Sequence, residues 1–143
     1  RLIDSLLARA LTTLPPEIGG DRPSLILRNL TRGARLLLPS GQDVAAHMGM
    51  VVLTDAELAL PGKGPAPLWY YVLREAAVQA GGEHLGQVGG RIVAEVFIGL
   101  LEKDPSSYLR NKPTWKPFLP SATPGDFTMP DLLAFAGHGL GAT

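Results

Sequence analysis

Apolar residues recur at steps of three and four along most of the chain, which is the spacing of amphipathic helices. Proline or glycine separates the successive patterns. The pattern predicts helices over residues 2–14, 24–38, 41–48, 54–60, 68–80, 85–101 and 130–136. No run of strand length alternates, and short apolar runs such as Met50–Leu53 are the only places where a strand could form. We therefore expect a mainly α fold, an irregular helical array with few or no strands.

Local signals predict where several of these helices begin and end. Ser40 follows Pro39 and can cap the helix after it, because a serine oxygen accepts a free backbone N–H. Thr54 and Glu57 have the spacing of a capping box, in which each side chain accepts the other residue's N–H. Thr128 stands in the cap position before the last helix.

The helix that starts near Leu85 is apolar over most of its circumference. Val88, Ile92 and Val96 fall at four-residue steps, and Phe97 lies beside them. Such a helix must be covered on nearly every side. Because the other predicted helices are mostly short, we expect it to pack against a segment outside this sequence.

The sequence predicts one unit over residues 1–143. Five prolines fall within residues 104–127, so we expect this segment to be irregular. We expect residues 138–143 to form a flexible tail, because glycine is frequent there. The sequence starts at Arg1 with no basic-then-apolar leader, so we expect any targeting segment to lie upstream.

The composition of the chain bears on whether it binds nucleic acid or a membrane. Hydrophobic residues make up 45% of the chain and charged residues 18%, which is typical of a folded protein. Thirteen basic residues balance thirteen acidic ones, so no net field attracts nucleic acid or an anionic membrane. The most apolar run, Ile92–Leu101, contains Glu95 and is shorter than the roughly 20 residues that a membrane span needs. We predict neither a nucleic-acid partner nor a membrane span.

Patterns typical of catalytic or metal sites are missing. The three histidines, His47, His84 and His138, lie far apart, and the absence of cysteine excludes thiolate chemistry and disulfides. The glycine-rich residues 81–90 lack the GxGxxG order and the lysine of a phosphate-binding loop, so we expect them to serve close packing. We predict no catalytic residue and no metal ligand in this chain.

Polar side chains gather on the helix predicted over residues 24–38. Steps of three and four place Arg28, Asn29, Arg32 and Arg35 along one stripe that has no acidic neighbour on the helix. One interpretation is a solvated face. The other is a cradle for a carboxylate or phosphate group, because guanidinium groups bind such anions with two parallel hydrogen bonds.

The residues around this stripe resemble those of animal-type haem peroxidases, the peroxidase–cyclooxygenase superfamily. In that family, a helix carries an asparagine, an arginine three residues later and a closing Leu-Pro step. Asn29, Arg32 and Leu38-Pro39 occupy those positions. The resemblance to bacterial members extends over residues 68–76, 88–108 and 125–133. Many members have Asp-His after the position of Arg35, whereas this chain has Leu36 and Leu37, so the roles of that pair do not carry over.

The resemblance implies that this chain is the C-terminal part of a haem peroxidase-like domain. It implies that Asn29 hydrogen-bonds the proximal histidine and that Arg32 pairs with a haem propionate. The family's proximal histidine, distal histidine and calcium site lie upstream of this helix, so the haem cofactor would be bound mainly by residues outside the chain. The partners implied are the upstream part of the same protein or a companion chain, peroxide and an unidentified electron donor.

Three functions therefore remain open. In the first, the parent protein is a peroxidase, and this chain alone is inactive. In the second, the chain is a haem-free helical interaction module or a degenerate fragment, which the long apolar helix favours. The third is fatty-acid dioxygenation, because relatives in the same superfamily run that chemistry on the same haem scaffold.

Overall fold

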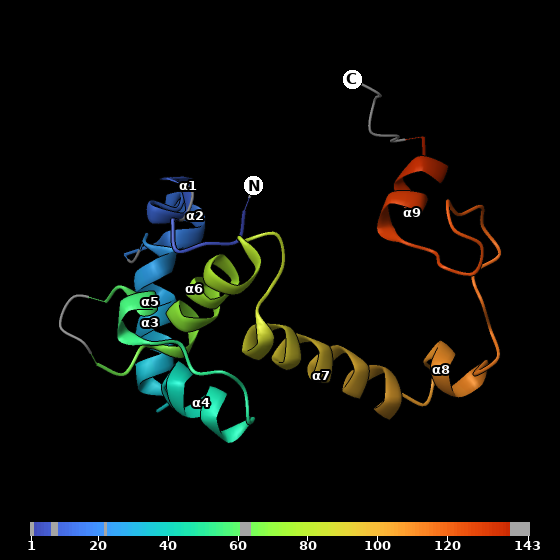
Figure 1. Cartoon of the computed structure of the whole chain (residues 1–143). Coiled ribbons are helices and arrows are strands. Elements are labelled where there is room, and N and C mark those ends of the chain that lie inside the picture. The colour runs from blue at the N-terminus through green and yellow to red at the C-terminus, as the bar shows by residue number, and fades with distance from the viewer. Residues whose placement is uncertain (1, 7–8, 22, 61–63, 138–143) are drawn as a thin grey trace. The chain divides into compact units, whose positions relative to one another are not determined.

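The computed structural model describes residues 2–6, 9–21, 23–60 and 64–137, and these residues are mainly helical (Figure 1). Its helices are α1 (Arg9–Thr12), α2 (Pro16–Gly19), α3 (Leu25–Arg35), α4 (Gly41–His47), α5 (Asp55–Leu58), α6 (Leu68–Ala80), α7 (Gln87–Lys103), α8 (Tyr108–Asn111) and α9 (Met129–Phe135). Within the described residues, extended pairing is limited to two isolated bridges, Ser40 with Pro67 and Thr123 with Asp126. The expectation of a mainly α, irregular helical array is confirmed.

The chain divides into two compact units, residues 1–96 and 97–143, and α7 runs from one into the other. The proline-rich segment over residues 104–127 contains the single turn α8 and one isolated bridge, and is otherwise irregular. The tail predicted over residues 138–143 lies outside the described residues.

Helix α6 is the centre of the first unit, where it contacts α3, α4 and α5 (Figure 1). Its Tyr71 is fully buried, and its hydroxyl oxygen accepts a hydrogen bond from Leu53 N at 3.1 Å. Burial raises the pKa of Tyr71, so the phenol stays neutral. The ring lies against Gly41 at the start of α4, where a Cβ atom would come within 2.0 Å of Tyr71 Cγ. Only glycine fits at position 41.

The N-terminus of α7 is capped by side chains of α6. Glu75 is 0% exposed, and its carboxylate accepts hydrogen bonds from Val88 N at 3.0 and 3.1 Å and from Gly89 N at 3.1 Å. Gln79, one turn later, accepts Gln87 N at 3.0 Å. The first N–H groups of a helix have no partner within it, so α6 supplies the acceptors that α7 needs. Gly86 makes room, because a Cβ there would lie 2.3 Å from Glu75 Cγ.

The predicted caps are present. Ser40 Oγ accepts Asp43 N at 3.1 Å before α4. Thr54 and Glu57 form the capping box of α5, and the hydrogen bonds from Thr54 lower the pKa of Glu57. Thr128 precedes α9, and its N–H donates to Asp131 at 2.8 Å. At these three caps the partner lies three residues away, and the sequence signal predicted each of them.

Three predicted helices are shorter in the structure by more than one residue. Helix α5 ends at Leu58 rather than at Leu60, because Ala59 takes a positive φ of 52°. Of residues 2–14, only Arg9–Thr12 are helical, because Ile3 N donates to Gly82 O at 2.7 Å and Leu6 N to Asp4 Oδ1 at 2.7 Å instead of to a helix. Residues 7–8 of that prediction lie outside the described residues. Helix α3 ends at Arg35, three residues early, because Leu37 takes a positive φ of 51° that a helix does not allow.

Removal of the Glu75 carboxylate should destabilise the first unit. We expect Glu75→Ala to lower the free energy of unfolding by about 3 kcal/mol, because Val88 N and Gly89 N lose their acceptors while buried. Urea unfolding followed by far-UV circular dichroism measures the change. Glu95→Ala is the matched control: this exposed residue pairs with Arg91, at 2.7 Å, and such surface pairs contribute little. Equal urea midpoints for the two variants would contradict the capping role.

Candidate functional site

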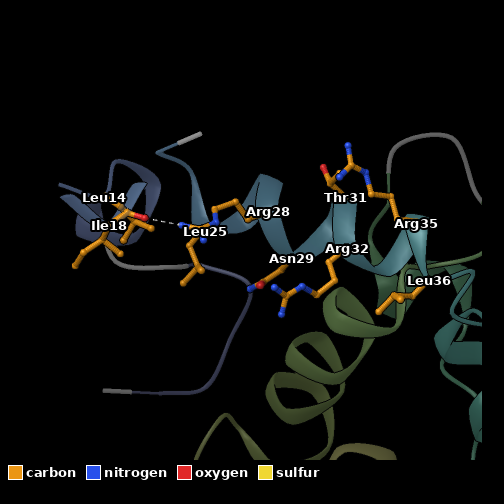
Figure 2. A pocket seen from close by; sticks show the side chains of 9 residues that line it. All are labelled: Leu14, Ile18, Leu25, Arg28, Asn29, Thr31, Arg32, Arg35 and Leu36. Carbon is orange, nitrogen blue, oxygen red and sulfur yellow. Dashed lines mark hydrogen bonds between the residues drawn. The ribbon is translucent and has the colours of Figure 1, made fainter. Parts of the chain in front are cut away.

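A cavity of about 680 Å³ lies along α3 (Figure 2). Apolar residues of α2 and α3 and the polar side chains of α3 share its walls. Its lining residues are Leu14, Ile18, Leu25, Arg28, Asn29, Thr31, Arg32, Arg35 and Leu36. This lining holds three arginines and no carboxylate, so the cavity favours an anion.

Arg28 joins two helices. Its Nη1 donates a hydrogen bond to Ile18 O, in α2, at 3.0 Å (Figure 2). The partner is a backbone carbonyl on a segment ten residues away. Arg28 therefore helps to place α2 against α3, and its guanidinium is already engaged.

Asn29 and Arg32 have free polar groups. Figure 2 shows both side chains on one side of α3, while Thr31 and Arg35 extend to the other side. Asn29 is half-buried and Arg32 is exposed. In the described part of the chain, neither side chain has a hydrogen-bond or ion-pair partner. The three arginines of the predicted stripe all line this cavity. Their side chains diverge, because Arg28 turns to Ile18 and Arg35 extends away from Arg32.

The two described histidines, His47 and His84, are not among the lining residues of this cavity. His47 is the last residue of α4, and His84 Nδ1 lies 2.8 Å from Leu85 O, before α7. His138 lies outside the described residues. Across the described ranges, no three His, Cys, Asp or Glu side chains gather as a metal site would require. The cavity along α3, with its three arginines, is suited to hold a carboxylate group.

The glycine-rich segment over residues 81–90 packs closely, as expected. Cβ atoms at Gly86 and Gly89 would come within 2.3 Å of Glu75 Cγ and 2.5 Å of Val72 Cγ1. These glycines let the start of α7 approach α6. They belong to the capping arrangement, and they line no phosphate cradle in the described structure.

A second cavity, of about 480 Å³, lies on α3, and the sequence pattern did not predict it. It lies between α3, the start of α4 and the segment that leads into α6. Gly33 could have indicated this cavity from the sequence. Glycine in the middle of a helix lowers the stability of the helix, and at this position it serves no turn.

Comparisons with protein-family models, with curated proteins and with solved structures found no match. Among the helices that the structure describes, none has the length and apolar character needed to cross a membrane.

The different roles of two arginines give a stability test. We expect Arg28→Ala to lower the free energy of unfolding by about 1 kcal/mol, because Ile18 O loses its donor. We expect Arg32→Ala to leave it unchanged, because no interaction is lost. Urea unfolding of both variants measures the difference. A larger loss for Arg32→Ala than for Arg28→Ala would show that Arg32 serves the fold and is not free for a ligand.

Proposed function

We propose that this chain is the C-terminal, haem-supporting part of an animal-type haem peroxidase domain. In this proposal Arg32 pairs with a haem propionate, and Asn29 hydrogen-bonds a proximal histidine that another segment supplies. The observation that carries the proposal is the pair itself: Asn29 and Arg32 extend to the same side of α3 and line a cavity without a partner among the described residues (Figure 2).

The residues present fit one part of such a cofactor. A guanidinium group binds a carboxylate with two parallel hydrogen bonds and keeps its charge when water is excluded. No acidic side chain lines this cavity, so nothing there competes for Arg32. The haem, held mainly by residues upstream, would supply the chemistry that reduces peroxide and oxidises a donor.

Asn29 fits a supporting role rather than a reacting one. Its amide oxygen can accept the N–H of an imidazole whose other nitrogen binds iron. Such a hydrogen bond fixes the ring's orientation and raises its basicity, which tunes the metal. Asn29 and Arg32 are one helical turn apart, so a single rigid helix would position both groups.

A second candidate is a helical interaction module without haem. The observation in its favour is the exposed apolar surface of α7, where Val96, Phe97 and Leu100 are 54%, 63% and 63% exposed. Contiguous exposed apolar residues mark surfaces that bind a partner. This candidate assigns no role to Asn29 or Arg32.

Blocking the propionates tests the role of Arg32. We expect the 143-residue chain to bind ferric haem about fivefold more tightly than haem dimethyl ester, because only the free acid can pair with a guanidinium. Arg32→Ala should remove this preference, and Arg91→Ala, the control, should retain it, because Arg91 lies on α7 and outside the lining of this cavity. Soret absorbance during titration gives both affinities. Equal affinities for acid and ester would contradict the proposed role of Arg32.

Added imidazole tests whether Asn29 accepts a hydrogen bond from the ring N–H of an iron-bound imidazole. With haem bound to the chain, added imidazole can occupy the axial position. We expect Asn29→Ala to weaken imidazole binding about threefold, because the free ring N–H loses its acceptor. Binding of 1-methylimidazole, which lacks that N–H, should be the same in both proteins. An equal loss for the two ligands would show that Asn29 acts only through the fold.

A further inference from the structure

The second cavity on α3 has a different chemical character from the first. Side chains of α3 form one wall, the turn after α3 and the start of α4 form the next, and the segment before α6 forms the third. Its lining residues are Asn29, Leu30, Gly33, Ala34, Leu38, Pro39, Ser40, Asp43, Pro65, Ala66, Pro67, Leu68 and Trp69. Most of these are apolar, and Asp43 is the one charged residue among them.

Hydrogen bonds fix the frame of this cavity. Gly41 N donates to Ala66 O at 2.9 Å, and Ala66 N donates to Gln42 Oε1 at 2.9 Å. Ser40 pairs with Pro67 in an isolated bridge. The start of α4 is thereby tied to the segment before α6. Pockets for small molecules are usually formed before the ligand arrives, and this frame meets that requirement.

Gly33 keeps the cavity open. Glycine inside a helix lowers its stability, and at Gly41 and Gly86 tight packing explains the choice. Gly33 has no such explanation, because a Cβ there would meet only Leu38 Cδ1, at an ordinary 3.8 Å. A side chain at position 33 would therefore extend into the second cavity.

The turn beside the cavity is strained. Leu37 has a φ of 51° and is 87% exposed, although a branched side chain disfavours this backbone conformation. The turn brings Leu38 and Pro39 to the cavity wall. Strained residues of this kind cluster at binding sites.

The lining selects a cation with an apolar body. Leu30, Leu68 and Trp69 offer apolar and aromatic surface, and a tryptophan face attracts organic cations. Asp43 Oδ2 accepts a hydrogen bond from Ser40 Oγ at 2.6 Å, while its Oδ1 has no partner in the described structure. Among the described residues that line this cavity none is basic, in contrast to the three arginines of the first.

We propose that this cavity binds a small organic amine, in which an aromatic or aliphatic body lies against Trp69 and the ammonium group faces Asp43. The volume of about 480 Å³ is within the range of small-molecule pockets. The proposal goes beyond the haem-supporting function and needs no haem.

Phenethylamine and 3-phenylpropionate form a matched pair of probes, because they have similar bodies and opposite charges. We expect calorimetry with the full chain to show binding of the amine and at least tenfold weaker binding of the acid. Asp43→Asn should weaken amine binding roughly fivefold, since it removes the charge and keeps an acceptor for Ser40. Asp55→Asn, at the start of α5 and outside the cavity lining, is the control and should have no effect.

Gly33→Leu tests the location of the site. The fold has room for a Cβ at this position, and leucine favours helix more than glycine does. We expect this variant to unfold at the same or a higher urea concentration and to lose amine binding at least tenfold. Retained amine binding in Gly33→Leu, equal binding of amine and acid, or no amine binding by the parent chain would each overturn the proposal.

Discussion

The hydrogen bonds from the start of α7 to the Glu75 carboxylate hold the first unit together. A carboxylate is rarely buried unless it accepts hydrogen bonds. The Glu75 carboxylate accepts three, from two backbone N–H groups. The same contacts satisfy backbone N–H groups at the start of α7, which have no acceptor within the helix. Gly86 makes room for the Glu75 side chain, and Gln79 accepts a further hydrogen bond from Gln87 N, so both residues serve the contact between α6 and α7.

The fixed α6 positions the surfaces where ligands can bind. Tyr71 anchors α4 through Gly41, and α6 also contacts α3. Helix α3 has no buried residue, and cavities of opposite chemical character lie along it. All charged residues in the lining of one are arginines, and apolar residues with Asp43 line the other. This separation of charge lets one short helix contribute to an anion site and a cation site.

The sequence predicted those features whose cause is local. Ser40, Thr54 with Glu57 and Thr128 each act within a few residues, and the helices after them begin as expected. The role of Glu75 could not be predicted, because its partners lie 13 and 14 residues away and no pattern specifies that contact. The same limit applies to Arg28 and Ile18 O, and to Ile3 N and Gly82 O, where tertiary contacts override the helical spacing. Asn29 and Arg32 were identified by a family resemblance, and their lack of a partner became visible only in the structure.

The proposed function depends on an Arg32 side chain that is free to bind a propionate. Nuclear magnetic resonance of the chain with ¹⁵N-labelled arginine tests it most directly, with zinc protoporphyrin as a diamagnetic stand-in for haem. We expect the Nε–H signal of Arg32 to shift saturably with the free acid and not with its dimethyl ester, while the signal of Arg91, outside the cavity lining, stays in place. An unmoved Arg32 signal, or the same shift with the diester, would contradict the account.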